Sequence, residues 1–371
     1  MECCKLGCCI KAALKKDKIY MTYIISGIQQ VGIGNTNVHE AFAWYNKNFG
    51  MDIPMLNEDA EATQMLPYTG GKGHKRHAIL AINLKGGGGF EIWQYKSRVA
   101  QPCSFKVEVA DLGFTIAKMK TENCEESFRR LKSNGVNIIT PITTGIDGRK
   151  HFYLKDLYGN TFEMVEFQDW FYKGKLEQGG PCGMVIGVSD ISRSMKFYAD
   201  ILGYDTVVAD KEDVFGDWKG IDGSEQKVRR MILKHSKPRA GSFSRLLGNS
   251  FIELVQFTEK SGRKIFENRF WGDQGFIHFC FDIKNMQALK QKCADSGHPF
   301  TVESNPDFDM GEAAGQFAYI EDPDGALIEF VETHKIPIMK KIGWYLHLNK
   351  KDPSKPLPDW MLKTLRFSRV K

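Results

Sequence analysis

The chain contains four copies of one pattern, and this internal repeat constrains its fold more than any other feature. The segment GIQQVGIGNTNVHEAFAWYNKNFGMD (27–52) matches PCGMVIGVSDISRSMKFYADILGYD (181–205). The segment GFTIAKMKTENCEESFRRLKSNG (113–135) matches GFIHFCFDIKNMQALKQKCADSG (275–297). A repeat of this length indicates one supersecondary unit used several times, and it outweighs local propensity.

Each copy is typical of a strand, then a helix, then several strands. In the fourth copy, alternating apolar residues predict a strand over Phe276–Ile283, and the spacing predicts a helix over Met286–Cys293 that stops at Gly297. Asp322-Pro-Asp-Gly325 is a tight turn that starts the last strand of the unit. The sequence therefore predicts an α+β fold built from βαβββ units.

The 371 residues are enough for about two domains. We expect a first domain over residues 21–170, a second over 180–334, and a basic C-terminal tail over 335–371, with a helix at Pro358–Phe367 that docks across the body. Residues 1–20 contain CCKLGCC, which is compatible with a soft-metal or lipid-modified segment. We favour the interpretation that they are an extension outside the native or ordered fold.

Charge is distributed unevenly along the chain. The net charge of +6 combines +8 from residues 335–371 and +3 from residues 1–20, which leaves −5 for the body. An acidic body argues against nucleic-acid binding, and no apolar run approaches the roughly 20 residues of a membrane helix. The nine Cys residues form no CxxC pair in the body. The sequence shows no secretory signal pattern, which favours reduced thiols and a cytoplasmic location.

Candidate ligands fall at corresponding places in the repeat. FEIWQY (90–95) aligns with IELVQF (252–257) and sets Glu91 opposite Glu253. In the same way, alignment of the turns DLYG (156–159) and DPDG (322–325) sets Glu163 opposite Glu329. His278 lies on the first strand of the unit that ends with Glu329. An imidazole and a carboxylate on strands of one unit are starting material for a metal site.

These motifs resemble those of a known family. An apolar first strand, a helix with Phe197-Tyr198, a Leu202-Gly203 stop and a DPDG…IE ending are similar to the vicinal oxygen chelate superfamily, which includes glyoxalase I, bleomycin resistance proteins and extradiol dioxygenases. The resemblance implies four βαβββ units paired into two glyoxalase-like half-barrel domains. It also implies a metal held by two units, each giving one residue from its first strand and one from its last.

Carried onto the second half of this chain, the resemblance implies a site of Glu253, His278 and Glu329, with Gly183 at a fourth position that offers no ligand. Two carboxylates and one His suit Zn²⁺, Ni²⁺, Mn²⁺ or Fe²⁺. Glu253 and Glu329 are then the candidate catalytic carboxylates, with Glu253 as our choice for moving a proton.

In the first half, the corresponding positions hold Gln30, Glu91, Ile116 and Glu163. Ile116 cannot bind a metal, and Lys118 on the same strand would repel a cation. Gln30, Glu91 and Glu163 could still form a weak oxygen site, but we expect this half to be degenerate and free of metal.

A basic stretch between the units offers a substrate contact. Arg229 or Arg230 could bind a substrate carboxylate as a bidentate fork, and since they are adjacent on a strand only one can face inward. The run Gly86–Gly89 lacks the Lys-Ser/Thr of a phosphate loop and predicts a flexible hairpin connection.

Three functions remain open for such a chain. The first is a metal-dependent lyase or isomerase, similar to lactoylglutathione lyase, that stabilises an enediolate of a small oxygenated substrate. The second is a metal-free protein that binds or sequesters a small molecule. An extradiol-type dioxygenase, which needs two His and one carboxylate, is a weaker third. Either a monomer or a homodimer fits the duplication.

Overall fold

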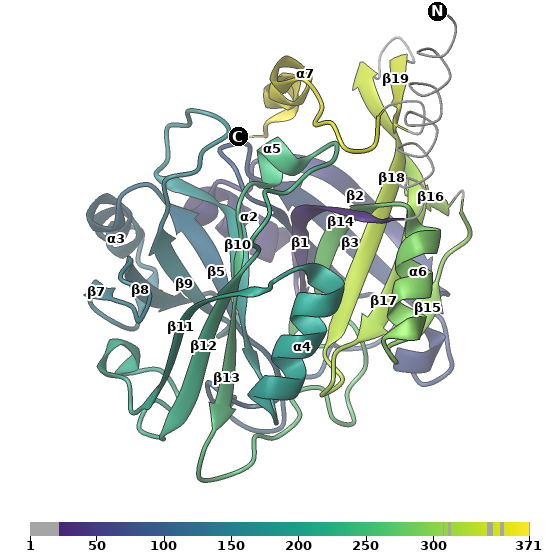
Figure 1. The fold of residues 1–371 in the computed structure, drawn as a ribbon. Helices are drawn as coiled ribbons and strands as arrows, with labels where there is room; N and C mark the ends of the chain where they lie inside the picture. Colours follow the sequence, from purple (N-terminus) through teal and green to yellow (C-terminus); the bar gives the residue numbers. More distant parts are fainter. Residues whose placement is uncertain (1–21, 307, 311–312, 340–343, 349–351, 371) are drawn as a thin grey trace, which may run out of the picture.

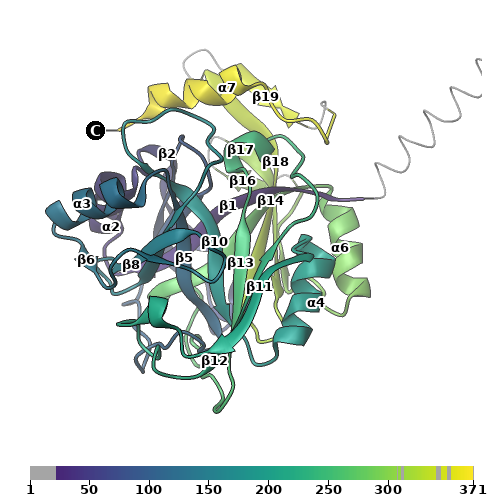
Figure 2. The same ribbon diagram turned by 60° about the vertical axis from the view of Figure 1, so that its left-hand side comes forward.

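The computed structural model describes residues 22–306, 308–310, 313–339, 344–348 and 352–370. The predicted N-terminal extension, residues 1–20, lies outside this part of the chain. The described residues form two curled sheets that lie side by side, with helices on the outside (Figure 1). The turned view in Figure 2 shows the C-terminal segment running across one end of both sheets.

Sheet A contains the first and last strands of the chain. In spatial order its main path is β15 (Val302–Glu303), β17 (Ala313–Glu321), β18 (Leu327–Met339), β14 (Gly275–Lys284), β1 (Ile24–Asn35), β4 (Gly89–Tyr95), β3 (His74–Ile82) and β2 (Ile53–Ala62). Off this path, β16 (Phe308–Met310) pairs with β17 and β19 (Trp344–His347) pairs with β18.

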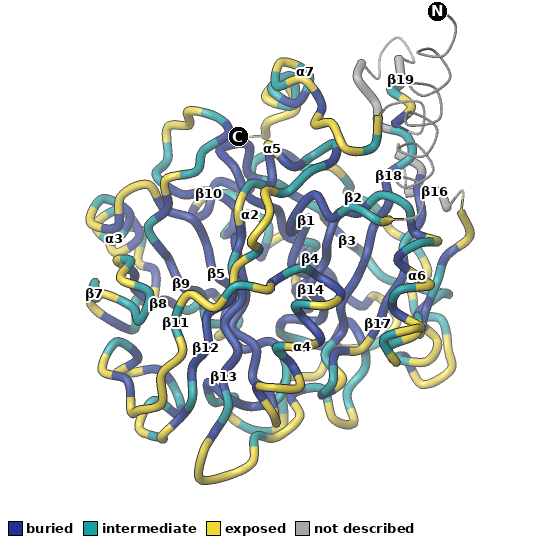
Figure 3. Tube along the Cα trace, viewed as in Figure 1, coloured by how far each residue is buried: buried dark blue, intermediate teal, exposed yellow. Residues whose placement is uncertain are grey.

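Sheet B contains the strands from the middle of the chain. Its order is β11 (Thr206–Asp213), β12 (Val228–Lys234), β13 (Phe251–Phe257), β10 (Gln178–Gly187), β5 (Gly113–Thr121), β9 (Thr161–Glu166), β8 (Lys150–Lys155) and β6 (Asn137–Ile138). In addition, β7 (Thr143–Thr144) pairs with β8. The central strands of both sheets are buried along most of their length (Figure 3).

The four predicted βαβββ units are present, and they pair into two half-barrels. The first unit (β1–β4) shares sheet A with the fourth (β14–β18), and the second (β5–β9) shares sheet B with the third (β10–β13). The pairing of neighbouring units implied by the halves 21–170 and 180–334 is therefore wrong. Each unit pairs through the edge of its first strand, as β1 does with β14. Any two units can pair in this way, so the repeat alone does not select the partners.

Each unit places one helix after its first strand: α2 (Val38–Phe49), α3 (Cys124–Ser133), α4 (Ile191–Leu202) and α6 (Met286–Asp295). All four begin where the sequence supplies an Asn or Asp whose side chain accepts a backbone N–H of the first turn. Gly50 and Gly203 end α2 and α4 in the left-handed conformation. The shorter helices are η1 (Leu66–Tyr68), η2 (Gly216–Trp218), α5 (Ser244–Leu247), α7 (Asp359–Lys363) and η5 (Thr364–Ser368).

Two buried Tyr–Asp hydrogen bonds connect the two sheets. The hydroxyl of Tyr45 on α2 donates to Asp156 in the β8–β9 turn at 2.5 Å. In the same way, Tyr198 on α4 donates to Asp322 in the β17–β18 turn at 2.9 Å. The helix of each odd unit is thereby tied to the turn of the following unit, which belongs to the other sheet.

A glycine-rich backbone contact joins the two sheets. The amide of Gly180 donates to the carbonyl of Gly86 at 2.7 Å. The amide of Gly88 donates to the carbonyl of Pro181 at 3.1 Å. The run Gly86–Gly89 does connect two strands, β3 and β4, but it is packed rather than a free hairpin. A Cβ on Gly180 would lie 2.1 Å from the carbonyl oxygen of Gly88, so only glycine fits there.

We expect Gly180→Ala to lower the free energy of unfolding by about 1–3 kcal/mol, because the backbones must separate to admit a methyl group. Gly216→Ala is the matched control, since its Cβ would meet no atom within 4 Å, and we expect it to stay within about 0.5 kcal/mol of wild type. Chemical denaturation of both variants gives the comparison. Equal stabilities would show that the close approach is not needed.

The C-terminal tail docks across the body, as predicted. The amide of Leu357 donates to the carbonyl of Ser242 at 2.9 Å, and that of Val370 donates to Asp52 at 2.8 Å. Leu357 and Leu362 join a buried cluster with residues of β2 and the β3–β4 connection. The helix expected at Pro358–Phe367 is shorter, because the α-helical part ends at Lys363 and continues as the 3₁₀ turn η5.

Candidate metal centre

Four polar side chains meet on the central strands of sheet A. They are Gln30 on β1, Glu91 on β4, His278 on β14 and Glu329 on β18. The four strands are direct neighbours in the order β18, β14, β1, β4. Gly32 of β1 pairs with both Glu91 and His278, so these ligands lie at the same level of the sheet. A Cβ on Gly32 would lie 2.3 Å from the imidazole, so the glycine makes room for the ring.

The four side chains converge on one point. Nε2 of His278 lies 3.2 Å from Oε2 of Glu91 and 3.2 Å from Oε2 of Glu329. The amide nitrogen of Gln30 lies 3.3 Å from Oε2 of Glu91 and 3.2 Å from Oε2 of Glu329. Ligand atoms that each lie about 2.1 Å from one metal ion are roughly 3–4 Å from one another. The spacing of these four side chains therefore suits a shared metal ion.

The hydrogen bonding of these groups also fits a metal ion. Both ring nitrogens of His278 and Oε1 of Gln30 are buried and make no hydrogen bond, although buried polar atoms normally have a partner. Exchanging the amide oxygen and nitrogen of Gln30 would turn its oxygen toward the two carboxylates. One imidazole nitrogen and three oxygens suit Zn²⁺, Ni²⁺, Mn²⁺ or Fe²⁺.

Electrostatics separate the two carboxyl groups of this centre. Burial raises the pKa of Glu329, and the charge of Glu91 raises it further, although His278 opposes both effects. Burial acts on Glu91 in the same way, but the charge of His278, whose Nε2 lies 3.2 Å from Oε2 of Glu91, outweighs it, and the pKa of Glu91 falls. For His278, burial lowers the pKa, but Glu329 and Glu91 together raise it above its usual value. The pKa shifts of the two carboxyl groups therefore run in opposite directions.

Aromatic side chains enclose the centre. The indole of Trp271 lies parallel to the ring of His278, with centroids 6.0 Å apart. The hydroxyl of Tyr319 donates to Oε1 of Glu329 at 2.7 Å, and Trp93 packs edge-on against Trp271. The side chains of His278 and Glu329 are 0% and 8% exposed and that of Glu91 is 15% exposed. This burial strengthens the electrostatic interactions within the centre.

The loop that carries Trp271 is held in place by a buried carboxylate. Asp273 accepts hydrogen bonds from Arg98 at 2.5 Å, from the amide of Gln101 at 2.8 Å and from the amide of Phe270 at 2.8 Å. The carbonyl of Trp271 accepts a hydrogen bond from the hydroxyl of Tyr95. Sequence analysis missed Trp271, Trp93 and Tyr319, because their strand and loop patterns do not differ from those of ordinary apolar positions.

The structure divides the predicted site residues between the two sheets. His278 and Glu329 lie together, as predicted, but Glu253 does not join them. It lies on β13 of sheet B, where Lys118 and Arg230 contact it. Its place in sheet A is taken by Glu91. The structure therefore does not bring the three expected residues together, because the fourth unit pairs with the first and not with the third.

The residues expected to form a degenerate first site are divided in the same way. Gln30 and Glu91 belong to the centre in sheet A, whereas Glu163 lies on β9 of sheet B. There it accepts a hydrogen bond from His151 at 2.7 Å and pairs with Lys118. A weak site made of these three carboxylate and amide groups is therefore excluded by their positions.

The two candidate substrate-binding arginines bind protein carboxylates. Arg230 is buried and contacts Glu253 at 2.6 Å and Asp217 at 2.9 Å. Arg229 lies on the opposite face of β12 and forms a two-pronged contact with Asp210 at 2.7 and 2.9 Å. Only one of them faces inward, as predicted, but both lie in sheet B, away from His278.

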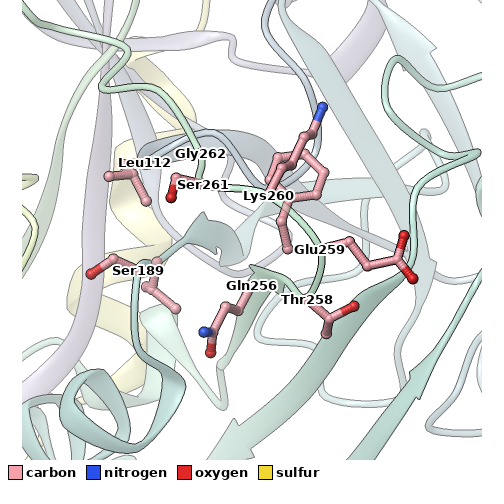
Figure 4. Close-up of a pocket in the computed structure, with 10 residues that line it drawn as sticks. Leu112, Ser189, Gln256, Thr258, Glu259, Lys260, Ser261 and Gly262 are labelled. Atoms are coloured by element: carbon pink, nitrogen blue, oxygen red, sulfur yellow. The ribbon is translucent and has the colours of Figure 1, made fainter.

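A cavity of about 430 Å³ lies elsewhere, at the end of β13 (Figure 4). Its lining includes Ser189, Gln256, Thr258, Lys260 and Ser261. None of the four residues of the centre contributes to it.

Among the described helices, none is both long enough and apolar enough to cross a membrane.

Comparison with known proteins gives consistent results. The model of the Glyoxalase/Bleomycin resistance protein/Dioxygenase superfamily matches residues 27–164 and 183–330. A "Probable lactoylglutathione lyase" from Synechocystis sp. is 23% identical over 156 residues, which are 40% of this chain and 92% of that protein. The crystal structure of glyoxalase I from Zea mays is 14% identical with a TM-score of 0.51, covering 84% of this chain and 92% of that one. A mutant of the same maize enzyme gives a TM-score of 0.52 at 15% identity, with the same coverage.

Proposed function

Since this chain belongs to the Glyoxalase/Bleomycin resistance protein/Dioxygenase superfamily, we propose that it is a metal-dependent lyase or isomerase acting on a small oxygenated substrate. The observation that carries the proposal is the convergence of Gln30, Glu91, His278 and Glu329 on one buried point. Three candidate ligand atoms, one each from Glu91, His278 and Glu329, lie within 4.8 Å of one another. A protein that only sequesters a ligand has no need of such a donor set.

Each residue of the centre has a separate role in this proposal. Gln30, Glu91 and His278 hold the divalent ion, with Glu329 as the fourth ligand. When bound, the ion polarises the oxygens of the substrate and stabilises negative charge that develops on them. Glu329 accepts the proton from the carbon next to the carbonyl and returns it to the neighbouring carbon. We assign this role to Glu329 from its geometry, since its Oε1 is held by Tyr319 and its Oε2 lies 3.2 Å from His278 at the centre.

The surrounding residues support this proton transfer. Tyr319 donates to Oε1 of Glu329 and holds the carboxylate in one orientation, which leaves Oε2 directed at the centre. Trp271 and Trp93 exclude water that would compete for the proton. An extradiol-type dioxygenase would need a second His among the ligands, and the sheet A centre holds one.

Metal content measured by mass spectrometry tests the proposal. We expect the wild-type chain, after incubation with Zn²⁺, Ni²⁺, Mn²⁺ or Fe²⁺ and desalting, to retain about one equivalent of metal. His278→Ala should lose it, because removing a ligand and its nitrogen weakens binding by at least about 10–100-fold. His39→Ala is the matched control, since His39 is exposed on α2, and it should retain the metal.

The activity assay uses the same three proteins. The metal-loaded wild type and His39→Ala should turn over the glutathione hemithioacetal of a 2-oxoaldehyde or epimerise an acyl-CoA, and His278→Ala should do neither. Absence of bound metal in the wild type with all four ions would refute the proposal. It would direct the search to small-molecule binding without metal.

A further inference from the structure

Sheet B repeats the geometry of the metal centre but fills it differently. Glu163 on β9 pairs in register with Lys118 on β5, as Glu329 on β18 pairs with Cys280 on β14. By the same comparison, Glu253 on β13 is the counterpart of Glu91 on β4, since each lies beside the first strand of its unit. Sheet B has therefore kept both carboxylates of the centre.

The two other ligand positions of sheet B carry no donor side chain. Ile116 stands where sheet A has His278, and Gly183 stands where it has Gln30. A Cβ on Gly183 would lie 2.1 Å from the carbonyl oxygen of Phe251, so no longer side chain fits there. The remaining protein ligands are two buried carboxylates, and without a cation their charges would repel each other.

A lysine supplies that cation. Nζ of Lys118 contacts Oε2 of Glu163 and lies 2.7 Å from Oε2 of Glu253. The side chains of all three residues are at most 3% exposed. The ammonium nitrogen of Lys118 therefore lies between the two carboxylates of sheet B. In sheet A, the corresponding carboxylates belong to Glu91 and Glu329, and they lie around the candidate metal position together with His278.

The other oxygens of the two carboxylates are also occupied. Oε1 of Glu253 accepts from Arg230 at 2.6 Å, and Oε1 of Glu163 contacts Nδ1 of His151 at 2.7 Å. Burial disfavours the charged lysine, but Glu163 and Glu253 outweigh it and raise the pKa of Lys118 above its usual value. Lys118 therefore keeps its positive charge in this buried position.

Apolar side chains close the space above these groups. Trp218 and Phe215 lie over the guanidinium of Arg230, with its central carbon 3.8 and 4.6 Å from their ring centroids. The indole of Trp218 donates to the hydroxyl of Tyr153 at 2.8 Å, and Ile116 packs in the same cluster. The concave face of sheet B is thus a packed core.

We propose that Lys118 is a permanent internal cation that takes the place of a metal ion in sheet B, so that sheet B binds no divalent ion. Removing the ammonium group then leaves Glu163 and Glu253 around an empty, negatively charged point. A divalent cation can enter this point, because its charge replaces that of the lysine. This inference concerns sheet B and does not depend on the proposed activity of sheet A.

The test measures Zn²⁺ and Mn²⁺ stoichiometry in the full-length chain. We expect about one equivalent for the wild type and about two for Lys118→Ala. In a His278→Ala background, which removes the sheet A centre, we expect about zero for His278→Ala alone and about one for the double variant. Thermal unfolding should show a lowered midpoint for the metal-free double variant and recovery when Zn²⁺ is added.

Lys120→Ala is the matched control for this experiment. Lys120 is also buried on β5, but its ammonium lies 3.9 Å from the carboxylate of Asp169, and among the described residues it pairs with no second carboxylate. This variant should gain no second equivalent of metal, and Zn²⁺ should not alter its unfolding midpoint beyond the shift seen in wild type.

Three results would overturn the inference. The first is two equivalents of metal in the wild type. The second is a folded Lys118→Ala variant that gains no metal. The third applies if Lys118→Ala does not fold without metal, and it is an equal refolding yield with and without Zn²⁺. A wild type that binds no metal, beside a Lys118→Ala variant that binds one, would support this inference while refuting the proposed function of sheet A.

Discussion

Glu329→Gln is expected to retain metal at saturating concentration but to lose turnover by roughly 10²–10⁴-fold, the usual contribution of a positioned general base. The amide is nearly the same size as the carboxylate and can still accept the hydrogen bond from Tyr319. It cannot accept a proton from the substrate. The measurement is kcat/KM together with metal content on the same sample, so that a loss of chemistry is separated from a loss of the ion.

Glu225→Gln provides the control, because Glu225 is exposed in the loop before β12, and we expect it to match the wild type in both measurements. If Glu329→Gln instead retained both its metal and a rate within about threefold of wild type, the proton transfer would have to be assigned to another group. Glu91 would then be the next candidate, as the second carboxylate of the centre.

Arg230→Ala is expected to lower the free energy of unfolding by about 3–5 kcal/mol, the usual cost of removing one partner from a buried ion pair. The variant leaves Glu253 and Asp217 without the guanidinium that contacts both. It also removes the planar group between Trp218 and Phe215 and opens a cavity beside them. Denaturant unfolding monitored by tryptophan fluorescence measures the change.

The neighbouring arginine gives a matched control on the same strand. Arg229 is half-exposed and pairs with Asp210 at the surface, where an ion pair contributes about 0–1 kcal/mol. We therefore expect Arg229→Ala to stay close to wild type. Similar losses for the two variants would mean that the buried network of sheet B does not stabilise the fold more than a surface pair does.

The repeat was sufficient to predict the units of this fold but not their partners. Alignment of the repeats set Gln30, Glu91, His278 and Glu329 at the candidate ligand positions of their units, and these are the residues that converge. The choice between Glu91 and Glu253 as the neighbour of His278 depends on which first strands pair. That pairing joins residues far apart in the chain, as β1 with β14 and β5 with β10, so no local sequence pattern reports it.

The positive charge of Lys118 was an informative signal about the site in sheet B. Lys118 was predicted to disfavour a metal near Glu163, and in the structure it contacts that carboxylate directly. Its second contact, with Glu253, could not be anticipated, because Glu253 follows 135 positions later in the chain and belongs to another unit. The enclosure by Trp271 was equally hidden, since it depends on a loop whose position is set by Asp273.

The nested order of the units has a consequence for synthesis of the chain. Sheet B is complete once residue 257 has been made, whereas β1 waits for β14 to emerge from the ribosome. Roughly 240 residues separate these two strands, which at about 5–20 residues per second is a delay on the order of 10–50 s. During this time the strand that carries Gln30 lacks its neighbour at one edge, and the core built from residues 113–257 is available as a surface on which it can pack. The proposed metal centre cannot be complete before this point, because Glu329 is among the last residues of the body to be translated.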